Sequence, residues 1–150
     1  MGELNRYKAE YIDRLATIFR SNTNPNLRII LAIEPDSLPN LITGITSIKK
    51  CKDAADGYKE GIAYAIATFS AIPNVYLYID AGNGGWLGPK TAQYAELAAD
   101  IMDKSLKLNP QSTISGFATG ISNFEPFDAH GVSPATVDCP SPVQEVFTSH

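Results

Sequence analysis

The sequence predicts an α/β fold in which about three parallel strands form a sheet and helices pack on it. Three short apolar segments, at residues 27–33, 74–80 and 112–120, have the length and composition of strands. Each follows a stretch whose apolar residues recur at helical spacing, and successive strands lie roughly 40 residues apart, as in βα units. Since such crossovers make the strands parallel, their carboxyl ends are expected at one edge.

The first helix is expected over residues 4–19, and the turn residues of "SNTNPN" end it. The strand at 27–33 closes with four consecutive apolar residues, which is typical of strands buried on both faces of a parallel sheet. It then meets Glu34, Pro35 and Asp36. Pro35 favours an extended backbone at Glu34, and Asp36 or the serine after it can cap a helical turn, so the strand ends at this acidic triplet.

The second helix and strand follow the same order. Apolar residues share one face over residues 53–69, which predicts a helix. The strand at 74–80 alternates between apolar side chains and Tyr76, Tyr78 and Asp80. Asp80 therefore shares a face with two tyrosines, and again a strand ends in an aspartate.

The remainder of the chain contains one more helix and strand. The segment "AGNGGWLGP", residues 81–89, is expected to be a glycine-rich loop around Trp86, and a third helix is predicted over 91–106. After the strand at 112–120, residues 127–150 are rich in Pro, Ser and Asp and predict a loop-like C-terminal segment. The whole chain, 1–150, is interpreted as part of a single domain.

Composition excludes several classes of partner. The chain has 150 residues, of which 44% are hydrophobic, and a net charge of −4. No basic cluster is longer than Lys49-Lys50, so no nucleic acid and no anionic membrane surface is expected as a partner. No apolar run approaches the roughly 20 residues of a membrane helix, and the N-terminal residues lack the apolar region of a secretory signal.

Cysteines and histidines offer little for catalysis. Cys51 and Cys139 are too far apart for a zinc knuckle or a redox pair, and they are either free thiols or one disulfide. His130 and His150 both lie in the polar C-terminal segment. We therefore expect no metal site and no cofactor, and the carboxylates are the better candidates for chemistry.

Three motifs resemble those of a known enzyme family. "ILAIEPDSLP", "YIDAGNGGWLGP" and "ISGFATGISNFEP" are similar to three blocks of glycoside hydrolase family 6, the cellobiohydrolase II type of cellulase, in the family's order. With the helices between them they cover about residues 5–126. The resemblance implies a distorted TIM-like α/β barrel, here partial, in a secreted enzyme. It also implies hydrolysis of β-1,4-glucosidic bonds in cellulose and cello-oligosaccharides with inversion.

The resemblance makes Asp36 the proton donor. An inverting enzyme needs a carboxylic acid at the leaving oxygen and a base about 6.5–9.5 Å from it, which leaves room for water. Such an acid needs a pKa raised by apolar surroundings or a nearby carboxylate. Glu34 either contributes to that field or makes structural hydrogen bonds.

Four further residues match substrate-binding positions of the family or lie beside them. Trp86 corresponds to a tryptophan that stacks on a glucose ring, although a lone tryptophan is more often a core residue. Asn123 matches a sugar-binding asparagine, and Asn83 stands where the cellobiohydrolases usually carry a histidine. Asp80 is either a second carboxylate of the site or a structural residue that holds the glycine-rich loop.

The family's catalytic domain is about twice as long as this chain or more, and its proposed base lies downstream of these motifs. We therefore expect an internal fragment that is inactive alone, with Cys51 unpaired and any secretion signal outside the chain. Two alternatives stay open: a non-catalytic carbohydrate-binding or vestigial module, and an unrelated parallel α/β enzyme. Both exo and endo action are compatible with the motifs.

Overall fold

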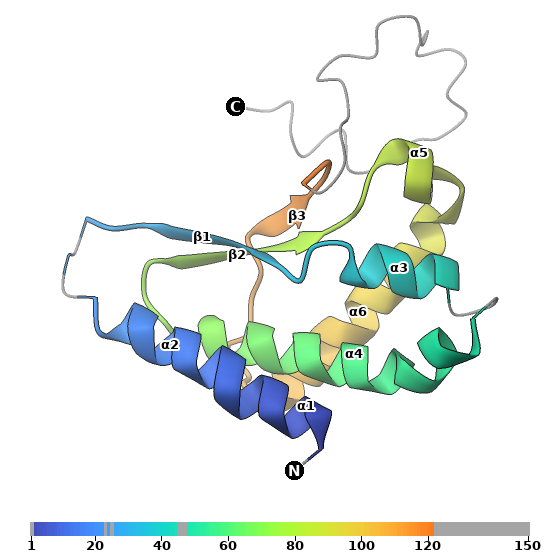
Figure 1. Cartoon of the computed structure of the whole chain (residues 1–150). Coiled ribbons are helices and arrows are strands. Elements are labelled where there is room, and N and C mark those ends of the chain that lie inside the picture. The colour runs from blue at the N-terminus through green and yellow to red at the C-terminus, as the bar shows by residue number, and fades with distance from the viewer. Residues whose placement is uncertain (1, 23, 25, 45–47, 122–150) are drawn as a thin grey trace, which may run out of the picture.

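The computed structural model describes residues 2–22, 24, 26–44 and 48–121. Its centre is a sheet of three strands in the order β1-β2-β3: β1 (Ile29–Ile33), β2 (Val75–Asp80) and β3 (Gly116–Ala118) (Figure 1). Both strand pairs are parallel. The predicted parallel α/β arrangement is confirmed.

The register of the sheet brings the strand ends to one edge. Ile33 at the end of β1 pairs with Ile79, and Asp80 at the end of β2 pairs with Ala118. β3 is shorter than the predicted strand at 112–120. Its expected first residues bond to helix ends instead: the Ser112 hydroxyl donates to the Ser105 carbonyl at 3.0 Å, and the Thr113 N–H donates to Ser70 Oγ at 3.1 Å.

The N-terminal helix was predicted over residues 4–19 and is confirmed, with one unexpected feature. It consists of α1 (Glu3–Arg6), the π-helical turn η1 (Tyr7–Ile12) and α2 (Asp13–Arg20). Ile12 and Ala16 face the core.

The remaining helices are α3 (Ser37–Gly44), α4 (Lys49–Phe69), α5 (Gly84–Leu87), η2 (Gly88–Lys90) and α6 (Thr91–Leu108). α4 and α6 confirm the helices predicted at 53–69 and 91–106, with α4 starting earlier. The helical turn expected after Asp36 is a full helix, α3. The predicted loop at 81–89 is wrong in part, because it contains α5 and η2.

The core lies between the sheet and the helices on one of its faces. In Figure 1, α2, α4 and α6 lie on the same side of the sheet. The buried residues on this side come from every layer, and include Ile33, Leu77, Ile79, Ile62, Ile66 and Ile101. At about 1.5–3 kcal/mol for each fully buried large apolar side chain, this layer is the main source of stability.

The opposite face of the sheet corrects one prediction. Ile30 is 71% exposed and Tyr76, its partner across the pair, is 41% exposed. The expectation that the first strand is buried on both faces is therefore wrong for the described residues. An apolar strand of this kind suits a barrel, where further strands enclose the second face, whereas three strands with helices on one side leave it open.

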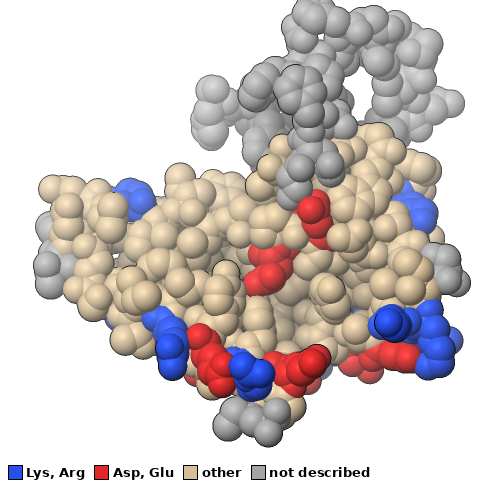
Figure 2. Space-filling model, viewed as in Figure 1, with Lys and Arg blue, Asp and Glu red and all other residues tan. Residues whose placement is uncertain are grey.

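Charged side chains on the surface are largely balanced by neighbours. Along the lower edge of the view in Figure 2, basic and acidic side chains lie side by side. Three of the ion pairs join neighbouring turns of one helix: Arg6 with Glu10 at 3.2 Å, Lys49 with Asp53 at 2.5 Å and Lys104 with Asp100 at 3.3 Å. Within the described residues, no helix has both the length and the apolar character needed to cross a membrane.

Candidate active site

The carboxyl edge of the sheet brings together the two aspartates that follow β1 and end β2. The backbone N–H of Asp36 donates to Asp80 Oδ2 at 2.5 Å. Across the next strand, the Gly120 N–H donates to the Gly82 carbonyl at 2.8 Å. The predicted meeting of Asp36, Asp80 and the segment that starts at Thr119 is confirmed as far as residue 121.

Asp80 is a buried anchor of this edge. Its side chain is 2% exposed, and its Oδ1 accepts a hydrogen bond from the Gly82 N–H at 2.9 Å while Oδ2 accepts that of Asp36. The Tyr94 hydroxyl donates to the Asp80 carbonyl at 2.7 Å, and burial raises the pKa of Tyr94 above its ordinary value. These contacts agree with the structural role considered for Asp80, in which it holds the glycine-rich loop. A direct contact with substrate stays a prediction.

The Glu-Pro-Asp segment adopts a strained turn. Glu34 has φ 46° and Asp36 has φ 67°, both in the left-handed region. Such a backbone costs a residue other than glycine about 1–2 kcal/mol. The extended backbone predicted at Glu34 from Pro35 is therefore wrong. Local bonds override that preference, since the Ser37 N–H and hydroxyl donate to the Glu34 carbonyl at 3.0 and 2.6 Å.

The Asp36 carboxyl has an oxygen with no partner. Its Oδ1 is buried and forms no hydrogen bond with any described residue. Buried polar atoms are nearly always bonded, so an orphaned carboxyl oxygen at this edge is a candidate for interaction with a ligand. The arrangement offers one uncommitted carboxyl group whose backbone is held in place by another, Asp80.

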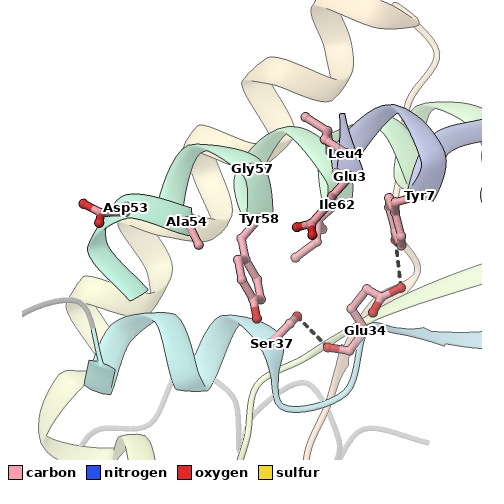
Figure 3. Close-up of a pocket in the computed structure, with 11 residues that line it drawn as sticks. Glu3, Leu4, Tyr7, Glu34, Ser37, Asp53, Ala54, Gly57, Tyr58 and Ile62 are labelled. Atoms are coloured by element: carbon pink, nitrogen blue, oxygen red, sulfur yellow. Dashed lines mark hydrogen bonds between the residues drawn. The ribbon is translucent and has the colours of Figure 1, made fainter. Parts of the chain in front are cut away.

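The Glu34 carboxylate lies on the helix side of the turn, away from this edge. Its Oε1 accepts a hydrogen bond of 2.7 Å from the Tyr7 hydroxyl, beside a pocket of about 440 Å³ (Figure 3). Burial and then the Glu34 carboxylate raise the pKa of Tyr7 far above its ordinary value. Of the two roles considered for Glu34, the structure confirms the structural hydrogen bond. Tyr7 was assigned only to the helix, because periodicity does not report hydroxyl contacts.

The segment after β2 fixes Asn83 and Trp86 against each other. Asn83 Oδ1 caps α5 by accepting the Trp86 N–H at 2.8 Å. The Trp86 indole is half-buried against the core, and its Nε1 donates to Thr43 Oγ1 at 3.4 Å. The substrate contacts expected for Asn83 and Trp86 stay predictions. Asn123 lies outside the described residues.

Gly82 must be glycine in this loop. Its φ is 62°, and a Cβ at this position would lie 3.2 Å from Pro39 Cγ and 3.3 Å from Pro39 Cβ. We expect Gly82→Ala to lower the free energy of unfolding by about 1–3 kcal/mol, because it adds backbone strain and crowding. Urea unfolding measures this, with Gly84→Ala as the control because its Cβ would meet nothing within 4 Å. Equal stability of the two variants would contradict this role of Gly82.

Of the two cysteines, the structure describes only Cys51. Cys51 is half-buried on α4 and forms no disulfide with any described residue. Cys139 and both histidines lie outside the described residues. No group of three or more His, Cys, Asp or Glu side chains within the described part could hold a metal ion.

The sequence model of glycosyl hydrolases family 6 matches residues 1–149. The chain belongs to this family. The 1,4-beta-D-glucan cellobiohydrolase CEL6C of Podospora anserina is 42% identical over 128 residues, which cover 85% of this family 6 chain and 31% of that protein. The chain thus spans about a third of the length of this relative.

Solved family 6 structures have the same fold. Endoglucanase CEL6B from Humicola insolens matches with a TM-score of 0.78 and 32% identity over 93% of this chain and 39% of that one. Cellobiohydrolase II (CEL6A) from Humicola insolens, in complex with glucose and cellotetraose, matches with a TM-score of 0.75 and 36% identity over 91% of this chain and 36% of that one. The three strands and their helices are therefore part of a distorted TIM-like barrel fold.

Proposed function

We propose that this chain supplies the acid side of an active site that hydrolyses β-1,4-glucosidic bonds in cellulose and cello-oligosaccharides with inversion. The observation that carries the proposal is the buried, unpartnered Oδ1 of Asp36 at the carboxyl edge of the sheet. Support comes from the family membership and from the related cellobiohydrolase that holds cellotetraose.

In this reaction the Asp36 carboxyl protonates the glycosidic oxygen as the bond to the anomeric carbon breaks. A second carboxylate removes a proton from the water that attacks the opposite face of that carbon. Neither Asp80 nor Glu34 suits this second role: both oxygens of Asp80 accept backbone hydrogen bonds, and the Glu34 carboxylate lies on the helix side of the turn, where its Oε1 accepts the bond from Tyr7. The base is proposed to lie outside these 150 residues, so the chain alone is expected to be inactive.

Trp86 is proposed as a platform for a sugar ring. An indole offers a rigid apolar surface that fits the C–H face of glucose, and the half-buried ring beside Thr43 leaves part of its surface accessible. Asn83, Asp80 and Asn123 are the other proposed contacts with the chain of sugars. Secretion is proposed as well, because insoluble cellulose is met only outside the cell.

A chimaera tests the function. Residues 1–150 replace the matching segment of the Podospora anserina cellobiohydrolase, and hydrolysis of cellotetraose is followed by proton NMR. We expect products whose new reducing ends are first the α-anomer, because inversion at a β-linked carbon gives α. A folded chimaera that binds cellotetraose, by tryptophan fluorescence, without cleaving it would overturn the enzymatic proposal and favour the carbohydrate-binding alternative.

A further inference from the structure

The turn that carries Asp36 is held from the helix side by one residue of the N-terminal helix. In Figure 3, Tyr7 and Glu34 point toward each other, and a second bond joins the Glu34 main chain to Ser37. The Tyr7 hydroxyl donates to Glu34 Oε1 at 2.7 Å, and the Ser37 hydroxyl donates to the Glu34 carbonyl at 2.6 Å. Glu34 is thus fixed through both its side chain and its backbone.

The position of the Tyr7 ring is closely determined. A Cβ at Gly61 of α4 would lie 3.3 Å from Tyr7 Cε1, so the missing side chain of Gly61 lets the ring approach α4. The Tyr11 ring also packs against the Tyr7 ring, with ring centroids 5.7 Å apart. Tyr7 is also the first residue of the π-helical turn, a feature that often marks functional positions in helices.

The Tyr7 hydroxyl is not needed to attach the N-terminal helix to the rest of the molecule. Lys8 pairs with Glu60 of α4 at 2.5 Å, and the Tyr64 hydroxyl donates to Asp13 Oδ1 at 2.8 Å. Both contacts join this helix to α4 without Tyr7. What the hydroxyl adds is a bond to the strained turn.

The turn has one such side-chain anchor on each side. Asp80 holds the Asp36 N–H from the sheet edge, and Tyr7 holds Glu34 from the helix face. Left-handed residues other than glycine persist only where their surroundings enforce them. We propose that Tyr7 is a positioning residue for Asp36: through Glu34 it fixes the turn that aims the Asp36 carboxyl. Its catalytic consequence rests on the proposed function, whereas the mechanical coupling does not.

The coupling is tested first in the 150-residue chain itself. Hydrogen exchange of the Asp36 backbone amide, measured by NMR, reports how often the turn opens. We expect Tyr7→Phe to speed this exchange by about tenfold, because it removes one anchor and keeps the ring. Tyr11→Phe is the matched control on the same helix, at an exposed ring. Unchanged Asp36 exchange in Tyr7→Phe, or an equal change in Tyr11→Phe, would overturn the proposal.

The second test measures catalysis in the chimaera. Tyr7→Phe is expected to lower kcat by about tenfold, as small misplacements of a catalytic group do, with KM and the alkaline limb of the pH profile, which reports the proton donor, unchanged. Glu34→Ala should lower kcat similarly, and the double variant should be no worse, because both remove one bond. Glu34→Gln keeps an acceptor and should retain more activity than Glu34→Ala.

The outcomes separate the two proposals. An alkaline limb that shifts in Glu34→Gln would overturn positioning, because it would assign Glu34 an electrostatic effect on the pKa of the acid. Additive losses in the double variant would overturn it as well. A chimaera that is inactive without any further substitution would contradict the proposed function. In that case the exchange rate of the Asp36 amide in the 150-residue chain still tests the coupling between Tyr7 and the turn.

Discussion

Replacing Asp36 by asparagine is expected to lower the turnover of cellotetraose by the chimaera by about 10²–10⁴-fold, because an amide has no proton to give to the leaving oxygen. KM should change little, since Oδ1 and its surroundings keep their shape. The measurement is the release of reducing ends at saturating substrate. Undiminished turnover would remove Asp36 from the reaction.

The leaving group provides an internal control for this substitution. An aryl cello-oligosaccharide with an acidic phenol needs little protonation, so its hydrolysis should lose far less in Asp36→Asn than that of cellotetraose. Asp53→Asn is the matched variant, because Asp53 is an exposed carboxylate paired with Lys49 on α4. Equal losses for both substrates would show damage to the fold instead of a missing acid.

Replacing Asp80 by alanine is expected to have the largest effect on stability. Its two oxygens bind the N–H groups of Asp36 and Gly82, and its side chain is buried. Hydrogen bonds to a charged group contribute about 1.5–3 kcal/mol each, so for two such bonds we expect a loss of roughly 3–6 kcal/mol in the free energy of unfolding. That is a large share of the 5–15 kcal/mol typical of a folded domain.

Urea unfolding of the 150-residue chain measures this loss. Asp103→Ala is the matched control, because Asp103 lies on the exposed face of α6, and it should change stability by no more than about 0.5 kcal/mol. Asp80→Asn should fall between the two, since its amide keeps one acceptor oxygen. A loss in Asp80→Ala as small as that in Asp103→Ala would refute the anchoring role.

Local patterns in the sequence were enough to find the main elements. The helix at 53–69 and the strand at 74–80 follow from spacing alone, because one buries a face every three to four residues and the other every second residue. Their order also predicted parallel strands, and hence that Asp36 and Asp80 lie at one edge. The elements, their parallel order and the shared edge depend only on neighbouring residues and on chain topology.

Contacts between distant residues were beyond such patterns. The pairing of Tyr7 with Glu34 joins residues 27 positions apart, and the contact of Asp36 with Asp80 spans 44. The Asn83 side-chain oxygen caps α5, a short helix that the glycine-rich sequence did not predict. The left-handed backbone of Glu34 contradicted the preference that Pro35 imposes.

By itself, then, the sequence determined the parallel α/β order, the acidic ends of two strands and the resemblance to family 6. Periodicity and motif order carry that information, and each is read from residues close in the chain. Only the tertiary structure decided that the Asp80 carboxylate accepts the Asp36 N–H, that one face of β1 lies open and that the Tyr7 hydroxyl bonds to Glu34. These depend on packing between elements, where several weak local preferences yield to hydrogen bonds made across the fold.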